Sequence, residues 1–320
     1  MASRDDELQA EVDQVLKSGH VIRESCRKFL AVIAPAIDAT CVNVEIPLPG
    51  RRMVLRCIIK RAQENLGTIV TTAESDQPHM STLMLRPLCE DLIYGAWLRT
   101  LPEDAADRLV LLSTSADITK SMLAQTQFLP KAYASLGPLP DGTFGQTLTN
   151  MIMAGGFGID TSDSEERYNS LRNELKELGR ELGWPGGKIP SVYGMADQAG
   201  LSDIYDFFYH GSSKAVHANL HNMSRMVWGD PERHIFTIDS HHFENYYVSF
   251  ALAYGIWLDS EIIDKIAKPE FPDEFQLIDE QSYNVWLAVV IAGLARRGNI
   301  PPLVTREELW WPIQRASDQA

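Results

Sequence analysis

Apolar residues recur along this chain mainly every three or four positions, the repeat of an amphipathic helix rather than of a strand. The pattern predicts helices over residues 4–37 with a break near Gly19, and over 51–74, 81–100, 102–134, 165–182, 241–266 and 272–297. The 81–100 segment is apolar on nearly all sides, which is typical of a central helix. Strand candidates are few, so we expect an all-α fold, a multi-helix bundle with long irregular loops.

Two stretches rich in glycine and proline interrupt this pattern, at 137–158 and 183–200. We interpret both as loops, the second with a short helix at its end. We expect one domain overall, made of an N-terminal helical segment (1–48), a helical core (50–267) and C-terminal helices packed on that core (268–320).

The stretch Leu201–Asp230 reads as one long amphipathic helix. At about 100° per residue, seven polar side chains share one face: Asp203, Asp206, His210, Ser213, His217, His221 and Ser224. This face holds His, Ser and Asp instead of the Lys and Glu of a solvated face. Histidine titrates near neutral pH and binds metals, so the face predicts a polar cavity. The alternative is a set of surface or packing histidines.

Arg86 and Glu90 lie one helical turn apart and can pair. They share their side of the helix with apolar residues, namely Leu83, Ile93 and Trp97. We therefore expect a buried ion pair whose partner is the His-rich face, or else an ordinary structural salt bridge. Pro87 is expected to disturb the local helix and free the carbonyl of Leu83.

Two histidines at i and i+4, His217 and His221, can bind one metal from a single helix face. The zinc-protease motif also needs a glutamate directly after the first histidine. Ala218 occupies that position, which excludes a zinc protease. Our main prediction is a site without metal or cofactor; a bare metal site with Glu90 or Asp206 as third ligand is the alternative.

Metal-free ribonuclease chemistry needs a base and a cation near a 2′-hydroxyl and a phosphate. Lys214 and His221, with Arg86 nearby, supply those groups. His241 and His242 either contribute or are first-turn surface residues of the next helix.

The net charge of −14 over 320 residues argues against broad nonspecific binding to nucleic acid or anionic membrane. It does not exclude a local basic groove, and one cluster of basic residues could form it: Arg51, Arg52, Arg56, Lys60 and Arg61. The cysteines have no metal-knuckle spacing and sit among apolar residues, so we expect reduced core side chains and no disulfide-linked partner. The acidic N-terminus and the lack of an 18-residue apolar run predict a cytoplasmic protein without a membrane span.

Two segments, RPLCEDLIYGAWL and YDFFYHGSSKAVHANL, resemble a bacterial family catalogued as a domain of unknown function, DUF5677, over about residues 50–260. The resemblance implies an all-helical protein in which Arg86, Glu90, Ser213 and His217 meet in one site. That family in turn looks distantly like the HEPN helical ribonucleases of toxin and phage-defence systems. Those carry Arg, four to six residues, then His; here Lys214 before His221 is the closest substitute.

Two function hypotheses follow. In the first, the chain is a HEPN-like, metal-independent ribonuclease or defence effector acting on RNA, with a site of Arg86, Glu90, Ser213, His217 and His221. In the second, it is a non-catalytic helical module that binds a partner or forms a homodimer through aromatic surfaces such as Trp310–Trp311.

Overall fold

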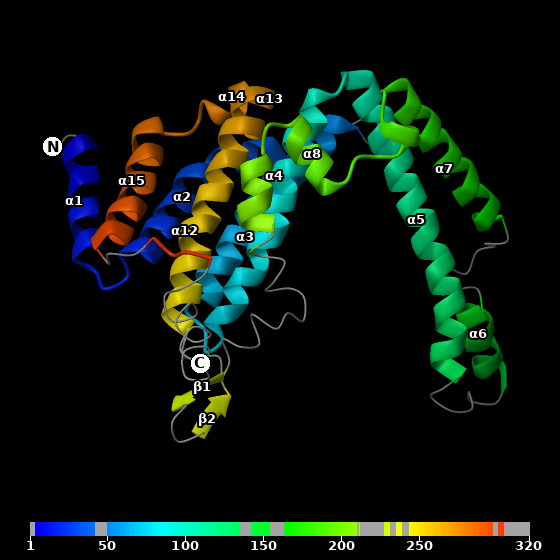
Figure 1. Ribbon diagram of the computed structural model, residues 1–320, viewed down its shortest axis with the longest axis horizontal. Helices are drawn as coiled ribbons and strands as arrows, with labels where there is room; N and C mark the ends of the chain where they lie inside the picture. Colours follow the sequence, from blue (N-terminus) through cyan, green and yellow to red (C-terminus); the bar gives the residue numbers. More distant parts are fainter. Residues whose placement is uncertain are drawn as a thin grey trace, which may run out of the picture. The chain divides into compact units, whose positions relative to one another are not determined.

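The computed structural model describes residues 4–41, 50–134, 142–153, 163–209, 211, 227–230, 235–238, 243–296 and 300–303. These residues are almost entirely helical, with one two-stranded hairpin, so the all-α prediction is confirmed (Figure 1). The chain divides into two compact units. The first comprises residues 1–46, 52–100 and 192–320, and the second comprises 47–51 and 101–191.

The first unit consists mainly of helices. In chain order its elements are α1 (Arg4–Lys17), α2 (Val21–Cys41), α3 (Arg51–Thr72), η1 (Pro78–Met84), α4 (Leu85–Thr100), α8 (Val192–Gln198), α9 (Ser202–Ile204), η3 (Tyr205–Tyr209), β1 (Val227–Asp230), β2 (Ile235–Ile238), α12 (Glu244–Ile262), η5 (Ile263–Ala267), α13 (Lys268–Glu270), α14 (Pro272–Phe275) and α15 (Glu280–Arg296). Of these helices, α2, α3, α4, α12 and α15 are the longest. The predicted break near Gly19 separates α1 from α2, and Pro35 lies inside α2 without ending it.

Helix α4 is central to this unit, as its apolar sequence predicts. Nine of its sixteen residues are buried, Trp97 among them, because neighbours cover it on several sides. Helix α12 lies beside α4 (Figure 1). A Cβ atom on Gly95 would lie 2.5 Å from Ile266 and 3.2 Å from Ile58, so glycine permits the close approach of α3 and η5 to α4.

Pro87 does not kink a long helix. The segment expected to be one helix over 81–100 is a 3₁₀ helix, η1, followed by α4, which starts at Leu85. Pro87 therefore falls in the first turn of α4, where a backbone N–H has no intrahelical acceptor to lose. The disturbance predicted beside Pro87 appears as this change from 3₁₀ to α helix at Leu85.

The long helix expected over Leu201–Asp230 is confirmed at its start and wrong at its end. Its start is α9 followed by η3, a π-helical turn. Its last four residues form β1, which pairs antiparallel with β2, Val227 opposite Ile238 and Asp230 opposite Ile235. Both strands are rich in β-branched and aromatic residues, which favour extended backbone. Residues 210 and 212–226 lie outside the described part of the chain.

Two further boundaries differ from the sequence pattern. Within the stretch read as a loop, residues Gly142–Met153 form helix α6. The helix predicted over 272–297 is interrupted between α14 and α15. Asp279 begins α15 as an N-cap: its carboxylate accepts from Ser282, which lowers its pKa, and the adjacent Arg4 lowers it further.

The second unit is a helical hairpin with a short third helix. It consists of α5 (Glu103–Ala134), α6, α7 (Ser164–Glu181) and the turn η2 (Pro185–Gly187). Helix α7 packs along α5, and η2 folds back on α7. A Cβ atom on Gly179 would lie 2.3 Å from the carbonyl oxygen of Gly187, so this close contact requires glycine.

No helix in the described ranges is long and apolar enough to cross a membrane. The four cysteines are free thiols. Cys26 and Cys89 are buried, as expected of core residues, whereas Cys57 is exposed, which corrects the expectation for that residue.

Candidate functional site

Arg86 stands in the first turn of α4 and is held from two sides. Its Nε donates to Oε1 of Glu90 at 2.9 Å, and its Nη2 donates to the hydroxyl of Tyr209 at 3.1 Å. Its Cζ lies 5.0 Å from the centre of the Tyr209 ring, a cation–π contact. The hydrogen bond to Glu90 is the main reason that the pKa of Arg86 lies above its ordinary value.

The Arg86–Glu90 pair is half-buried, not fully buried as its apolar neighbours suggested. The side chains are 19% and 39% exposed. Leu85, Leu88 and Cys89 on the same turns are fully buried. Arg86 and Glu90 therefore lie where the buried face of α4 meets solvent. An exposed carboxylate and a fixed guanidinium at such an edge are accessible to a ligand.

Three tyrosines extend away from Arg86 as a row of ring contacts. Tyr209 stacks on Tyr205 with 4.6 Å between ring centres and 14° between planes. Tyr205 meets the edge of Tyr193 at 5.4 Å. The π-helical turn places Tyr205 and Tyr209 on the same side of η3, and desolvation raises the pKa of Tyr205. Tyr193 is 50% exposed, so the row ends at solvent.

A cavity of about 460 Å³ opens next to this group, between α3, α4 and α8. Glu90, which pairs with Arg86, also lines the cavity. Its wall is mostly apolar and is formed by Val54, Ile58, Ile93, Tyr94, Val192 and Met195. Cys57 and the ion pair Arg61–Asp91 complete the lining. A concave, largely apolar site with a few polar groups is the usual form of a small-ligand pocket.

The Arg61–Asp91 pair fixes a guanidinium at the edge of this cavity. Nε of Arg61 donates to Oδ2 of Asp91 at 2.7 Å, and Nη2 donates to Oδ1. Asp91 is 2% exposed, whereas Arg61 is 60% exposed. A buried carboxylate thus orients an accessible guanidinium by two parallel hydrogen bonds.

Helix α8 forms one wall of the cavity and is tied to the core. The indole Nε1 of Trp97 donates to Oε1 of Gln198 at 2.8 Å. Because Trp97 is buried in α4, this bond anchors α8 against the helix that carries Glu90 and Asp91.

The structure brings together two of the five predicted site residues, Arg86 and Glu90. Ser213, His217 and His221 lie outside the described residues, as do His210, Lys214, Ser224, His241 and His242. The meeting of arginine, glutamate, serine and histidine therefore stays a prediction. Among the described residues no three histidine, cysteine or carboxylate side chains are grouped as metal ligands, and the alternative metal site depends on the same undescribed imidazoles.

Sequence reasoning missed Tyr193, Tyr205, Tyr209 and the Arg61–Asp91 pair. Thirty positions separate Arg61 from Asp91, so no local pattern signals their contact. Two members of the basic cluster have different partners within the first unit. Arg56 lies over the Phe271 ring, 4.4 Å from its centre, while Arg61 turns to Asp91.

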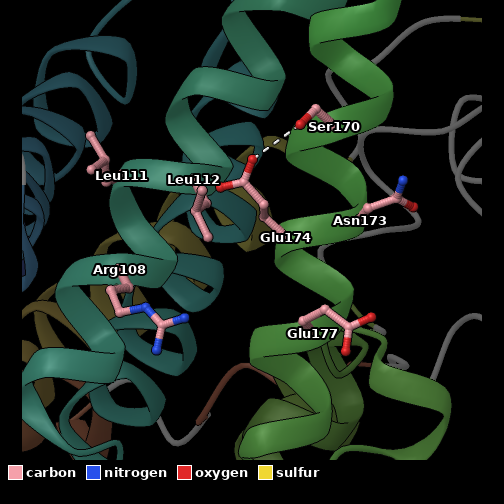
Figure 2. A pocket seen from close by; sticks show the side chains of 7 residues that line it. All are labelled: Arg108, Leu111, Leu112, Ser170, Asn173, Glu174 and Glu177. Carbon is pink, nitrogen blue, oxygen red and sulfur yellow. Dashed lines mark hydrogen bonds between the residues drawn. The ribbon is translucent and has the colours of Figure 1, made fainter.

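A smaller hollow of about 360 Å³ lies between α5 and α7 in the second unit. Figure 2 shows Leu112 on α5 between the two helices, with Arg108 also on α5 and Glu174 and Glu177 on α7. Its polar groups are satisfied by near neighbours: Ser170 donates to Glu174 at 3.2 Å, and Arg108 pairs with Glu181 at 2.8 Å. It has no buried charge comparable to Asp91, so we consider the first cavity the stronger site.

One buried carboxylate lies elsewhere, in α12. Asp259 is 1% exposed, and its Oδ2 has no hydrogen-bond partner within the described part of the molecule. Burial raises its pKa to about 8. The thiol of Cys26, itself buried, has its pKa raised by the same desolvation and, to a lesser degree, by Asp259.

Comparison with known proteins gives one match. The model of a family of unknown function, DUF5677, matches residues 52–235, which include α3, α4, α8 and η3. No curated protein and no solved structure matches the chain. The matched range covers more than half of the chain and contains Arg61, Arg86, Glu90, Asp91 and Tyr209 together, so this protein belongs to the DUF5677 family of unknown function.

Proposed function

We propose that this protein is a HEPN-like, metal-independent ribonuclease of the toxin or phage-defence type, acting on single-stranded RNA in the cytoplasm. The observation that carries the proposal is the fixed guanidinium of Arg86, held by Glu90 and stacked on Tyr209. Such a cation stabilises the charge that develops on a phosphate in the transition state.

The row of tyrosines supports RNA rather than an isolated phosphate as the substrate. Single-stranded nucleic acid is bound by aromatic rings on which bases stack, combined with basic groups that follow the backbone. Tyr193 is half exposed at one end of the row, and Arg86 closes the other end. A base on Tyr193 and a phosphate at Arg86 match this arrangement.

The proposed reaction is transesterification. A histidine, His217 or His221, takes the proton of the ribose 2′-hydroxyl, whose oxygen then forms a bond to phosphorus. The bond from phosphorus to the 5′-oxygen breaks, and that oxygen receives a proton from the second imidazole. The products are a 2′,3′-cyclic phosphate and a free 5′-hydroxyl, and no metal is needed. Ser213 hydrogen-bonds the phosphate in this scheme, and it follows Tyr209 by four positions in the sequence.

The test is cleavage of a mixed-sequence RNA pool by purified protein in the presence of a chelator. We expect fragments with cyclic phosphate ends, and loss of activity by at least about 100-fold in His217→Ala, the range for removing general-base catalysis. Arg27→Gln is the matched control for Arg86→Gln, because Arg27 also pairs with glutamates but on an exposed surface. Intact RNA with and without divalent metal would refute the proposal.

The second candidate is a non-catalytic module that binds a partner or forms a homodimer. The observation in its favour is a series of exposed large apolar residues on α5: Leu111, Ile118 and Phe128. Exposed apolar side chains on one helix are typical of association surfaces when they are contiguous. The test compares the sedimentation coefficients of the wild type and of the double variant Ile118→Asp, Phe128→Asp. If the protein self-associates, the variant should have the smaller coefficient.

A further inference from the structure

We propose that the cavity between α3, α4 and α8 binds a nucleobase, with guanine as the preferred base. The inference rests on the proposed function, because it assigns the base specificity of that same site. Glu90 links the two: one oxygen engages Arg86, where the phosphate is expected, and the side chain also lines the cavity. A single nucleotide can therefore place its phosphate and its base on the two sides of Glu90.

The charges around the cavity select a neutral ligand. Arg61 contributes one positive charge, Asp91 and Glu90 contribute two negative charges, and Arg86 balances Glu90. An anion would face two carboxylates, and a cation would face the exposed guanidinium of Arg61. A neutral group that carries donors and acceptors along one edge meets neither penalty.

The polar atoms define which edge is needed. Among hydrogen bonds between described residues, Arg61 uses Nε and Nη2 toward Asp91, so we assign Nη1 as the donor to a ligand carbonyl. Glu90 uses Oε1 toward Arg86, so we assign Oε2 as the acceptor of ligand N–H groups. Guanine presents a carbonyl oxygen beside N–H donors on one edge, whereas adenine offers an amino group where Arg61 requires an acceptor.

The remaining walls fit the flat, apolar faces of a base. Ile58 and Ile93 come from α3 and α4, and Met195 comes from α8. A thioether packs favourably on aromatic rings. The volume of about 460 Å³ is within the range of small-ligand pockets.

The test is calorimetric titration of the full chain with GMP, IMP, AMP, CMP and UMP. All five share the ribose and the phosphate, so differences report the base. We expect GMP to bind at least about 10-fold more tightly than AMP, the discrimination of one good bidentate contact, with IMP between them. Arg61→Gln is expected to remove that preference.

A second variant keeps the proposal falsifiable if Arg61→Gln is unstable. Val192 lines the cavity at the half-exposed start of α8, so Val192→Trp fills the space with little demand on the core. It should abolish GMP binding, whereas Leu277→Trp, at an exposed apolar position that does not line the cavity, should not. Bound GMP should also slow alkylation of Cys57, the exposed thiol of the cavity.

Three results would overturn the inference. They are equal affinity for all five nucleotides, no saturable GMP binding at millimolar concentration, and GMP binding that persists in Val192→Trp. RNA cleavage separates it from the proposed function. If the protein cleaves RNA without base preference, and Val192→Trp leaves that cleavage unchanged, only the guanine pocket is refuted. If GMP binds at the cavity but the protein cleaves no RNA, the guanine pocket is supported and the proposed ribonuclease activity is refuted.

Discussion

Asp91 and Arg61 form an ion pair in which one partner is buried and the other is accessible. The carboxylate on α4 is almost fully covered, and the guanidinium on α3 reaches it by two hydrogen bonds while keeping most of its surface in solvent. The pair thus joins α3 to α4 at the edge of the cavity and presents an oriented cation there.

Arg61→Met should destabilise the protein, because it leaves the Asp91 carboxylate buried without its counter-charge. We expect the free energy of unfolding to fall by about 2 kcal/mol, less than for a fully buried pair because Arg61 is solvated. Urea denaturation measures it. Arg108→Met removes an exposed pair with Glu181 and should change stability by less than about 1 kcal/mol. Equal losses in the two variants would contradict the special role of Asp91.

Tyr209→Phe removes the hydroxyl that accepts from Arg86 but keeps the ring. If Arg86 acts on a phosphate, this change loosens its guanidinium and should lower kcat/KM for RNA about 5-fold, near 1 kcal/mol for one partly exposed hydrogen bond. Melting temperature should change little. A Tyr193→Phe variant, which has lost a hydroxyl but retains its ring contact with Tyr205, serves as the control.

Asp259→Asn should stabilise the protein increasingly as pH rises. The folded pKa of about 8 exceeds the ordinary value of 3.8, so between these values the folded state holds a proton that the unfolded state releases. Stability from this group is complete below about pH 4 and falls by about 1.4 kcal/mol per pH unit toward pH 8. Asparagine removes this dependence.

The measurement is the difference in unfolding free energy between Asp259→Asn and wild type at pH 5, 6 and 7. Other titrating groups cancel in that difference. A difference that is constant over this range would show that Asp259 ionises normally in the folded state.

Gly179→Ala should destabilise the second unit. The added Cβ would lie 2.3 Å from a backbone oxygen of Gly187, which cannot move aside as a side chain can. We expect a loss of about 2 kcal/mol, typical of overpacking. Gly67→Ala is the matched control within α3: its Cβ would meet nothing within 4 Å, and it should stabilise by about 0.5–1 kcal/mol through helix propensity.

The cysteines should differ sharply toward an alkylating reagent at neutral pH. Cys57 is exposed and should react in the folded protein, because the reagent can reach its sulfur atom. Cys89 is buried, and its pKa is raised to about 12, so it should react only after unfolding. Peptide mapping by mass spectrometry measures the rate at which each of the two thiols is alkylated. Equal rates in native buffer would show that α4 opens easily.

The sequence predicts most of the long helices because their apolar spacing is a local signal. It fails where two local signals compete. Residues 227–230 continue an apolar periodicity, but their β-branched and aromatic character and the partner strand at 235–238 make them extended. Asp279 caps α15 within a run whose spacing alone suggests an unbroken helix.

For the candidate site, the local pair Arg86–Glu90 is predictable and the distant contacts are not. One turn of helix brings Arg86 and Glu90 together, whereas Tyr209 reaches Arg86 over 123 positions and Arg61 reaches Asp91 over 30. Such contacts depend on how helices pack. The sequence alone does not reveal which helices pack against Gly95.

The bond between Trp97 and Gln198 gives the molecule an optical reporter of its own. The indole is shielded from water and its N–H is committed to α8, the wall of the cavity that faces α3 and α4. A guest that pushes this wall outward would break that bond and shift the emission or the near-ultraviolet ellipticity of this chromophore. Occupancy of the cavity can thus be read without attaching any dye.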